Sequence, residues 1–368
     1  MNLKSYLNVW SFLVILTVFL VSVALTILPH SEKFNRKLLG TRFSPLKKDT
    51  YLAADCMIFD IFGRTIRHLP FTRCIFFEDG SLISSDLSPG RKNLLSMSNA
   101  HGKLIWGLPV SADHTMSLCR ENKAIVVTTS KDQWFKGQLT RGDRIAVVDL
   151  AGNILYTWDL LDHYEELKPF VRFIRGGSPI LLPEHFETLR SKALSEVTHV
   201  NSAYEIPDNE NSKNMSAFQK GNFIVNPLGE HLIILSADLK QILWISKKEY
   251  NAHDVQVLEN GNLLLFRNQL ERRIGERPFI LEINPLDESI VWSYEGSPKL
   301  SATLFGSVSY KNGLFVLTGN PDIKYITVIN RRGQVLTNFT PDIQPFPSSS
   351  GFFHVQFLNH NGFMKNDM

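Results

Sequence analysis

Beyond residue 50 the chain alternates short apolar runs with polar turns. The runs are four to eight residues long, are rich in β-branched and aromatic residues, and are separated by Gly, Asn and Asp. Runs of this length and composition predict β-strands, whereas long amphipathic helical patterns are missing from most of this region. We therefore expect a mostly β domain over residues 51–363.

One local pattern recurs along this domain. Each copy has an Asp or Asn, a tight turn that usually contains Gly, and an apolar strand that ends in Trp or a substitute. The six copies span residues 60–67, 99–106, 149–158, 238–244, 284–292 and 330–336. Hairpins repeated every ~40 to 50 residues indicate a β-propeller, and we expect its tryptophans to form the core rather than to bind a cofactor.

The two ends of the domain complement each other. Residues 354–357 are typical of the inner strand of a further unit, whereas the residues before position 67 are typical of outer strands without an inner one. Joining them predicts a six-bladed propeller closed by N- and C-terminal strands, followed by a loose tail over residues 364–368. Residues 160–197 break the period, and helical patterns over 159–172 and 183–196 predict a helical insertion beside the channel mouth.

The N-terminal residues suit a membrane segment. Residues 9–28 are uncharged and almost wholly apolar, which is about the ~20 residues a helix needs to cross a bilayer. We expect an uncleaved signal anchor over residues 1–30, a linker over 31–50, and a single-pass protein of the inner (cytoplasmic) membrane whose propeller faces the periplasm or the exterior. The positive-inside rule opposes this orientation, because one lysine precedes the segment and six basic residues follow it.

Composition excludes some partners. In the 368 residues, 39 Lys and Arg stand against 36 Asp and Glu, without a basic stripe, so we expect no nucleic-acid partner. Three cysteines, Cys56, Cys74 and Cys119, allow at most one disulfide and one leftover thiol.

Three histidines keep a similar distance from the tryptophans. His114, His199 and His253 precede Trp158, Trp244 and Trp292 by 44, 45 and 39 residues. If each tryptophan ends a blade, each histidine begins one, and the first strand of a blade lines the central channel. The sequence therefore predicts that the three imidazoles converge at one channel mouth. The closing strand adds His354, and Tyr310 lies in the unit that lacks a clear histidine.

Clustered imidazoles can bind a metal, move protons, or attack an electrophile. Asp113 and Asp254 neighbour two of the histidines, but alternation along a strand turns neighbours away from the channel. We therefore rank a metal second, and expect neither a metal nor a cofactor. Asn201, two positions after His199, suits the stabilisation of oxyanions.

Two motifs resemble those of the bacterial arylsulfotransferases, a family of six-bladed propellers. They are His-Val-Asn-Ser over residues 199–202, and the His253 strand over 252–258 with Asn-Gly-Asn at 260–262 and Phe-Arg-Asn at 266–268. The resemblance, strongest over 198–294, implies sulfuryl transfer from an aryl sulfate to a phenol without a nucleotide-sulfate donor. His253 would attack the sulfur and become a sulfohistidine; His199, Asn201 and His114 would bind the sulfuryl oxygens; and one imidazole would protonate the leaving phenolate.

Two residues depart from the family pattern. The family's arginine, in a Ser-Ser-Arg setting, is matched by Val225-Asn226-Pro227-Leu228, and the aspartate of Phe-Asp-Asn is replaced by Arg267. Either another arginine binds the anion, or the activity is lost or changed; the candidates are Arg267, Arg272, Arg273 and Arg277. The alternative is a non-catalytic envelope propeller that binds a ligand or protein partner at the channel. A quinone-cofactor dehydrogenase ranks third, since no calcium-and-carboxylate set is evident.

Overall fold

The structure is a computed structural model, and the described residues are 50–69, 71–77, 79–86, 94–110, 112, 114–171, 195–196, 198–227, 231–250, 252–267, 279–295, 306–319, 325–341 and 355–358. Within these ranges, no helix is both long and apolar enough to cross a bilayer. The predicted anchor, residues 31–49 of the predicted linker, and the predicted tail lie outside these ranges, so they stay predictions.

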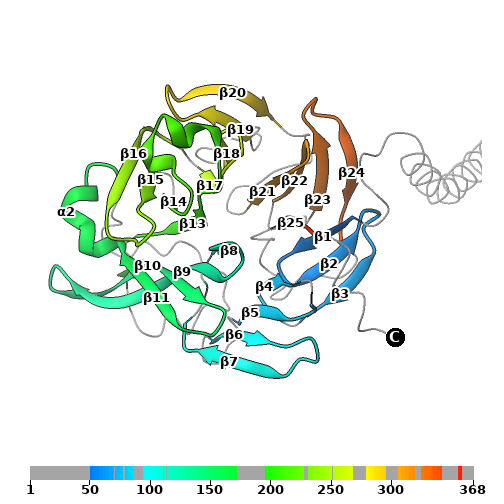
Figure 1. Cartoon of the computed structure of the whole chain (residues 1–368), viewed down its shortest axis with the longest axis horizontal. Helices are drawn as coiled ribbons and strands as arrows, with labels where there is room; N and C mark the ends of the chain where they lie inside the picture. Colours follow the sequence, from blue (N-terminus) through cyan, green and yellow to red (C-terminus); the bar gives the residue numbers. More distant parts are fainter. Residues whose placement is uncertain are drawn as a thin grey trace, which may run out of the picture. The chain divides into compact units, whose positions relative to one another are not determined.

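The described strands form six sheets, arranged around one axis as the blades of a propeller (Figure 1). Each blade runs from an inner strand to an outer strand. Blade 1 contains β25 (Val355–Leu358), β1 (Tyr51–Ala54), β2 (Met57–Asp60) and β3 (Thr65–His68). Blade 2 contains β4 (Arg73–Phe76), β5 (Leu82–Asp86), β6 (Leu94–Ser98) and β7 (Leu104–Leu108). Blade 3 contains β8 (Met116–Cys119), β9 (Ala124–Phe135), β10 (Gln138–Asp149), β11 (Ile154–Asp159) and the short β12 (Ser195–Glu196).

The second half of the ring repeats this order. Blade 4 contains β13 (Val200–Glu205), β14 (Phe223–Pro227), β15 (His231–Leu235) and β16 (Ile242–Glu249). Blade 5 contains β17 (Ala252–Val257), β18 (Leu263–Arg267), β19 (Phe279–Asn284) and β20 (Ser289–Tyr294). Blade 6 contains β21 (Gly306–Lys311), β22 (Leu314–Gly319), β23 (Tyr325–Asn330) and β24 (Val335–Phe339). The predicted all-β, six-bladed propeller is confirmed.

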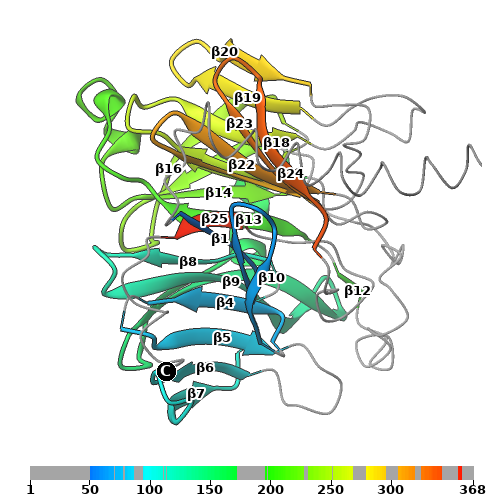
Figure 2. The same ribbon diagram turned by 90° about the vertical axis from the view of Figure 1, so that its right-hand side faces the viewer.

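Blade 1 is built from both ends of the domain. β25 is its inner strand and pairs antiparallel with β1, from Tyr51 opposite Leu358 to Ala54 opposite Val355. The side view shows these two strands next to each other (Figure 2). The predicted closure by N- and C-terminal strands is confirmed.

The turn before the outer strand has one geometry in blades 1, 2, 3 and 6. An Asp or Asn side chain accepts hydrogen bonds from the main-chain N–H groups two and four residues later, and a Gly three residues later has a φ between 74° and 89°. The four capping residues are Asp60, Asn99, Asp149 and Asn330. Since only glycine adopts such a φ without strain, the predicted Asp/Asn-to-Gly pattern has a backbone cause.

These glycines also hold neighbouring blades together. A Cβ on Gly152 would lie 3.0 Å from the Trp106 ring of the preceding blade, and the Trp106 indole N–H donates to Leu150 O at 2.8 Å. Gly63 meets Phe339 in the same way across the closure. The outer-strand aromatics therefore pack between blades, as predicted for the tryptophans.

Hydrophobic clusters fill the spaces between blades. Each of five clusters contains residues of two neighbouring blades; for example, Val126, Trp158 and Phe223 join blade 3 to blade 4. Burying such side chains is the main favourable term in folding. The core is therefore a ring of inter-blade layers rather than one central mass.

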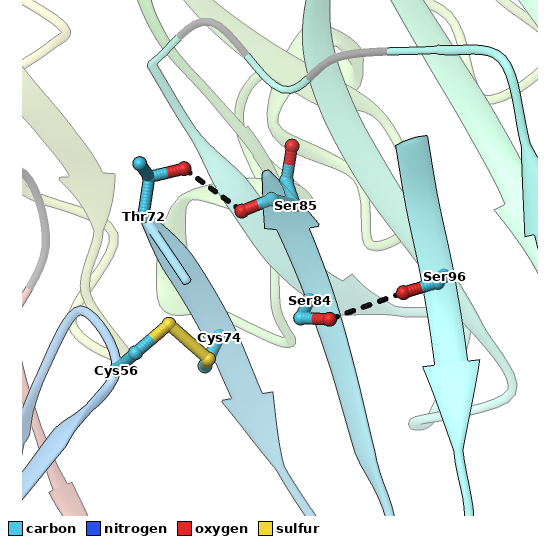
Figure 3. The surroundings of a disulfide bond; sticks show 6 residues. All are labelled: Cys56, Thr72, Cys74, Ser84, Ser85 and Ser96. Carbon is cyan, nitrogen blue, oxygen red and sulfur yellow. Dashed lines mark hydrogen bonds between the residues drawn. A yellow bond between two sulfur atoms is a disulfide. The ribbon is translucent and has the colours of Figure 1, made fainter. Parts of the chain in front are cut away.

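A disulfide and specific hydrogen bonds also join each blade to the next one around the ring. The Cys56–Cys74 disulfide links blade 1 to blade 2, beside hydrogen bonds from Thr72 to Ser85 and between Ser84 and Ser96 (Figure 3). Arg73 Nε donates to His114 O between blades 2 and 3, Thr115 Oγ1 donates to Asn201 O between blades 3 and 4, and Asn201 Nδ2 donates to Ala252 O between blades 4 and 5. Ser307 Oγ donates to Asp254 Oδ2 between blades 5 and 6, and Val355 N donates to Ser307 Oγ between blades 6 and 1. Cys119 is a buried free thiol whose pKa burial raises to about 12. One disulfide and one leftover thiol agree with the cysteine count.

The insertion in blade 3 is helical at its beginning. A 3-10 helix, η1 (Leu160–His163), leads into the short α2 (Tyr164–Leu167). The second predicted helix is wrong at its end, because Ser195 and Glu196 form β12, which pairs in parallel with Thr140 and Arg141 of β10. A strand forms there because β10 offers an unpaired edge beside this segment. The rest of that predicted helix lies outside the described residues. Blade 4 carries two further 3-10 helices, η3 (Glu210–Lys213) and η4 (Ser216–Phe218).

Candidate functional site at the channel mouth

The three predicted histidines lie at the beginnings of three adjacent inner strands. His114 is two residues before β8, His199 is directly before β13, and His253 is the second residue of β17. Inner strands of adjacent blades contact each other here, β8 with β13 and β13 with β17. The repeat therefore brings these side chains to one end of the channel.

The imidazole rings are in direct contact range. The His114 and His199 ring centroids are 4.4 Å apart in an edge-to-face arrangement, and those of His114 and His253 are 5.9 Å apart. His253 is buried, whereas His114 and His199 are half-buried. The predicted convergence of three imidazoles is confirmed by this geometry.

Backbone irregularities place two of the site residues. The pairing of β17 with β18 shifts register between Ala252 and Asp254, which leaves His253 as the extra residue of a bulge. The pairing of β13 with β14 shifts between Val200 and Ser202, which leaves Asn201 in the same position. Bulges bend a strand and re-aim the side chain that they carry. Strand pairing therefore aligns Asn201, rather than His199, with His253.

Burial and electrostatics keep His114 and His253 neutral. Burial, and then the neighbouring His199, His253 and Arg73, hold the pKa of His114 well below its usual 6.5. Burial, and then His199 and Arg73, lower the pKa of His253 to about 3. Each charge that could form on these rings is poorly solvated and repelled by its neighbours. Neutral imidazole nitrogens can accept protons or attack an electrophile.

Arg73 is a site residue that the sequence motifs did not identify. It is the first residue of β4, it is 3% exposed, and its Nε donates to His114 O at 2.7 Å. The positive charge of its guanidinium contributes to the low pKa values of His114 and His253. A signal was present: Arg73 begins the inner strand of the blade that precedes His114, the place that histidines take in the next units. Blade 2 thus supplies a cation to the site.

Two carboxamides fix the strand that carries His253. Asn201 Nδ2 and Asn226 Nδ2 both donate to Ala252 O, at 3.1 and 3.0 Å, and both side chains are buried. Among the described residues, neither Oδ1 atom has a hydrogen-bond partner. A buried carbonyl oxygen without a donor costs ~1 to 3 kcal/mol. Such acceptors beside the imidazoles suit a site that meets polar ligand groups.

The other predicted ligand-binding residues are less central. Arg267 ends β18 and pairs with Ala252, one position from His253. Tyr310 lies near the far end of β21 and packs against Phe315, with ring centroids 4.9 Å apart, so its contacts are those of a core residue. His354, Leu228, Arg272, Arg273 and Arg277 lie outside the described residues.

The acidic neighbour of His253 faces another blade. Asp254 Oδ2 accepts hydrogen bonds from Ser307 Oγ at 2.7 Å and from Val308 N at 3.2 Å, so it belongs to the junction with blade 6. Asp113 lies outside the described residues. In the part of the chain that the structure describes, no three His, Cys, Asp or Glu residues are arranged to hold a metal ion.

Comparison with known proteins assigns no family to the chain. No family model matches the chain, and no curated protein matches it. One similar solved structure is the Cps50 (Swd1) β-propeller domain of Myceliophteria thermophila, with 9% identity over 73% of this chain and 68% of that chain and a TM-score of 0.40. BamB from Moraxella catarrhalis has 11% identity over 81% of this chain and 87% of that chain, with a TM-score of 0.36. Apo AztD from Citrobacter koseri has 9% identity over 84% of this chain and 97% of that chain, with a TM-score of 0.41. The fold assignment rests on the strand pairing, and the resemblance to arylsulfotransferases has no support from sequence comparison.

Proposed function

We propose that the channel mouth binds an aryl sulfate and transfers its sulfuryl group to a phenolic acceptor through His253, without a nucleotide-sulfate donor. The observation that carries the proposal is the gathering of three imidazoles with the buried guanidinium of Arg73. A sulfate monoester carries one negative charge on three oxygens, and fixed cationic and N–H donors stabilise that charge as the sulfuryl group moves.

The proposed reaction has two steps, transfer of the sulfuryl group to His253 and its transfer from His253 to the acceptor, and both use the same residues. His253 is neutral because of its low pKa, so a ring nitrogen lone pair forms the N–S bond while the S–O bond to the phenol breaks. The leaving phenolate takes a proton from His199, because His114 is held neutral by its low pKa and a neutral imidazole is too weak an acid to give one up. In the second step the acceptor phenol gives its proton back to that imidazole, its oxygen forms the new S–O bond, and the N–S bond breaks. Splitting one substitution into two is the advantage of nucleophilic catalysis.

Arg73 takes the place of the cation that the family motif lacks here. The family's arginine falls on Leu228, outside the described residues, whereas Arg73 of blade 2 donates to the main-chain carbonyl of His114 and acts electrostatically on the His114 and His253 rings. Asn201 is tied by its amide N–H to Ala252 O and its unpartnered Oδ1 can only accept, which suits a role in fixing His253 rather than in binding an oxyanion. The sulfuryl oxygens would therefore contact Arg73, His114 and His199.

One observation favours a second candidate. A pKa of about 3 for His253 makes its ring a weak base, and nucleophilicity falls with basicity. A site of this kind also suits a non-catalytic propeller that holds an anionic ligand or partner at the channel. Both candidates use the same residues, so turnover decides between them.

The test is nitrophenolate release from 4-nitrophenyl sulfate with a phenol acceptor. We expect turnover by the wild type, a sulfuryl adduct on His253 by mass spectrometry, and loss of both in His253→Ala. His101→Ala is the matched control, since His101 lies exposed in a blade 2 turn. Turnover that survives His253→Ala contradicts the assigned nucleophile. No turnover and no adduct with any aryl sulfate leaves the binding candidate.

The location of the domain is part of the proposal. We infer a single-pass anchor over residues 9–28 of the inner membrane, with the propeller outside the cytoplasm. The Cys56–Cys74 disulfide supports an oxidising compartment, whereas the basic residues after the apolar segment oppose this orientation. Protease added to intact spheroplasts should degrade the propeller; protection until the membrane is lysed would place it in the cytoplasm.

A further inference from the structure

Blade 3 carries a long hairpin that extends past the site. β9 and β10 are each 12 residues long, whereas β8 has four residues. Thr128 N donates to Thr115 O at the level of His114, and β9 continues for seven residues beyond that level to Phe135. At ~3.3 Å per residue, this part of the hairpin is ~23 Å long, and it begins at the end of the blade where His114 lies.

The hairpin is well formed. Lys136 and Gly137 make its two-residue turn, with φ values of 49° and 80°, which is the turn that matches strand twist. At its base, Asp143 N donates to Thr198 Oγ1 at 3.0 Å, directly before His199. The Arg141 guanidinium pairs with Asp132 at 3.0 Å. The hairpin is therefore bonded to the site at its base, and its tip packs on α2 through Phe135 and Lys136.

The tip of this hairpin is apolar and exposed. Trp134 is 75% exposed, the highest value among the exposed large hydrophobic side chains of the described residues, and its cross-strand partner Leu139 is 43% exposed. The Lys136 ammonium lies 3.9 Å from the centroid of the Tyr164 ring in α2, which lies beside the hairpin (Figure 1). Trp134 and Lys136 of the hairpin and the neighbouring Tyr164 of α2 are of the residue types that favour the interface between lipid and water.

We propose that this hairpin tip, Trp134 with Leu139 and Lys136, docks on the surface of a lipid bilayer and holds the histidine end of the channel toward the membrane. The proposal rests on the membrane anchor of the proposed function. The apolar segment ends at residue 28 and the described domain begins at residue 50, so a linker of at most ~75 Å keeps the propeller near the bilayer. Tethering makes even weak docking effective, because it raises the local concentration.

Docking would depend on apolar contact more than on charge. Between Gln133 and Thr140 the only charged residue is Lys136, and α2 beside the tip carries Glu165 and Glu166. We therefore expect docking on neutral phosphatidylcholine vesicles, with little effect of salt. With this arrangement, aryl sulfates on amphiphiles at the membrane surface would meet the site.

The test uses the full chain reconstituted into phosphatidylcholine vesicles. The Gln138→Cys variant is labelled with an environment-sensitive NBD dye, without reductant, since Cys119 is buried and the other cysteines are in the disulfide. We expect quenching by lipids that carry nitroxide near the headgroup. The matched control is Lys123→Cys, an exposed position at the opposite end of β9. Its label should stay in water.

Two further variants sharpen the result. Adding Trp134→Ser and Leu139→Ser to the labelled chain should lower the ratio of docked to undocked label about tenfold or more, while turnover of soluble 4-nitrophenyl sulfate in detergent stays that of the wild type. A tip label that stays in water like the control overturns the proposal, as does a chain that does not float with the vesicles. Quenching in a chain without sulfotransferase activity would keep the docking and remove only the proposed reaction.

Discussion

The two sides of the ring carry different residues at one level of the channel. On blades 4 and 5, Asn201 and His253 lie on bulges of the inner strands, and blade 3 adds His114. On blades 6 and 1, Ser307 and Val355 lie on inner strands that pair in regular register and bond to each other. The shared ring supplies equivalent positions, and local backbone irregularity turns some of them into a site. One side carries the candidate site, and the other closes the ring.

Removing the positive charge of Arg73 should have the largest effect on the activity of the candidate site. We expect Arg73→Met to lower kcat/KM for 4-nitrophenyl sulfate by about 100-fold or more. The free energy of unfolding should also fall, by about 1 kcal/mol, because Met leaves His114 O without its donor. Steady-state kinetics and urea unfolding on the same preparations measure both quantities.

Two controls accompany this variant. Arg73→Lys keeps the charge and should keep part of the activity, whereas Arg332→Met, at an exposed turn of blade 6, should match the wild type. An Arg73→Met protein that turns over normally would show that the guanidinium is structural.

Blade 1, on the closure side, should affect stability instead, through its disulfide to blade 2. Replacing both Cys56 and Cys74 with Ala removes a cross-link over 18 residues and should lower the free energy of unfolding by about 3 kcal/mol, measured by urea unfolding. KM for the aryl sulfate should stay the same, because neither cysteine is among the site residues. A folded double variant with impaired substrate binding would mean that the two sides are coupled.

The low pKa of His253 predicts a dependence of stability on pH. Its value is about 3 in the folded protein against 6.5 for an ordinary histidine. Between these values the unfolded chain binds a proton that the folded chain does not, so the free energy of unfolding falls as the pH is lowered, by up to ~1.4 kcal/mol per pH unit. His253→Gln should remove this contribution. Unfolding curves of the wild type and of His253→Gln, recorded between pH 3 and 6.5 and above pH 6.5, measure this contribution. If the free energy of unfolding changes with pH in the same way in both proteins, the low pKa of His253 is wrong.

The smallest effect is expected at the Asp149 turn, whose geometry recurs in four blades. Asp149→Ala removes the acceptor for Ala151 N and Asn153 N and should lower the free energy of unfolding by about 1 kcal/mol, with unchanged activity. Asp149→Asn keeps an acceptor oxygen, as Asn99 and Asn330 do in their blades, and should be nearly neutral. Equal losses in both variants would mean that charge, rather than hydrogen bonding, stabilises the turn.

The fold was predictable because its determinants are local. The Asp/Asn-to-Gly turns of blades 1, 2, 3 and 6, and the aromatics that pack between blades, are visible in the sequence. The site was predictable only where it follows that repeat, as for His114, His199 and His253. Arg73 was missed because a motif defined by histidine does not include an arginine at the same place. The bulges at Asn201 and His253 depend on pairing between strands, which no local pattern encodes.

The shared blade has a consequence for how the chain folds. β1 is made first and its inner partner, β25, is made last, so in the nascent chain the edge of β1 stays unpaired until nearly the whole domain has been synthesised. An unpaired edge promotes association with other chains. The Cys56–Cys74 bond spans only 18 residues and can form early, which holds the first two blades together during this delay. We expect chains refolded with this bond intact to aggregate less than reduced chains.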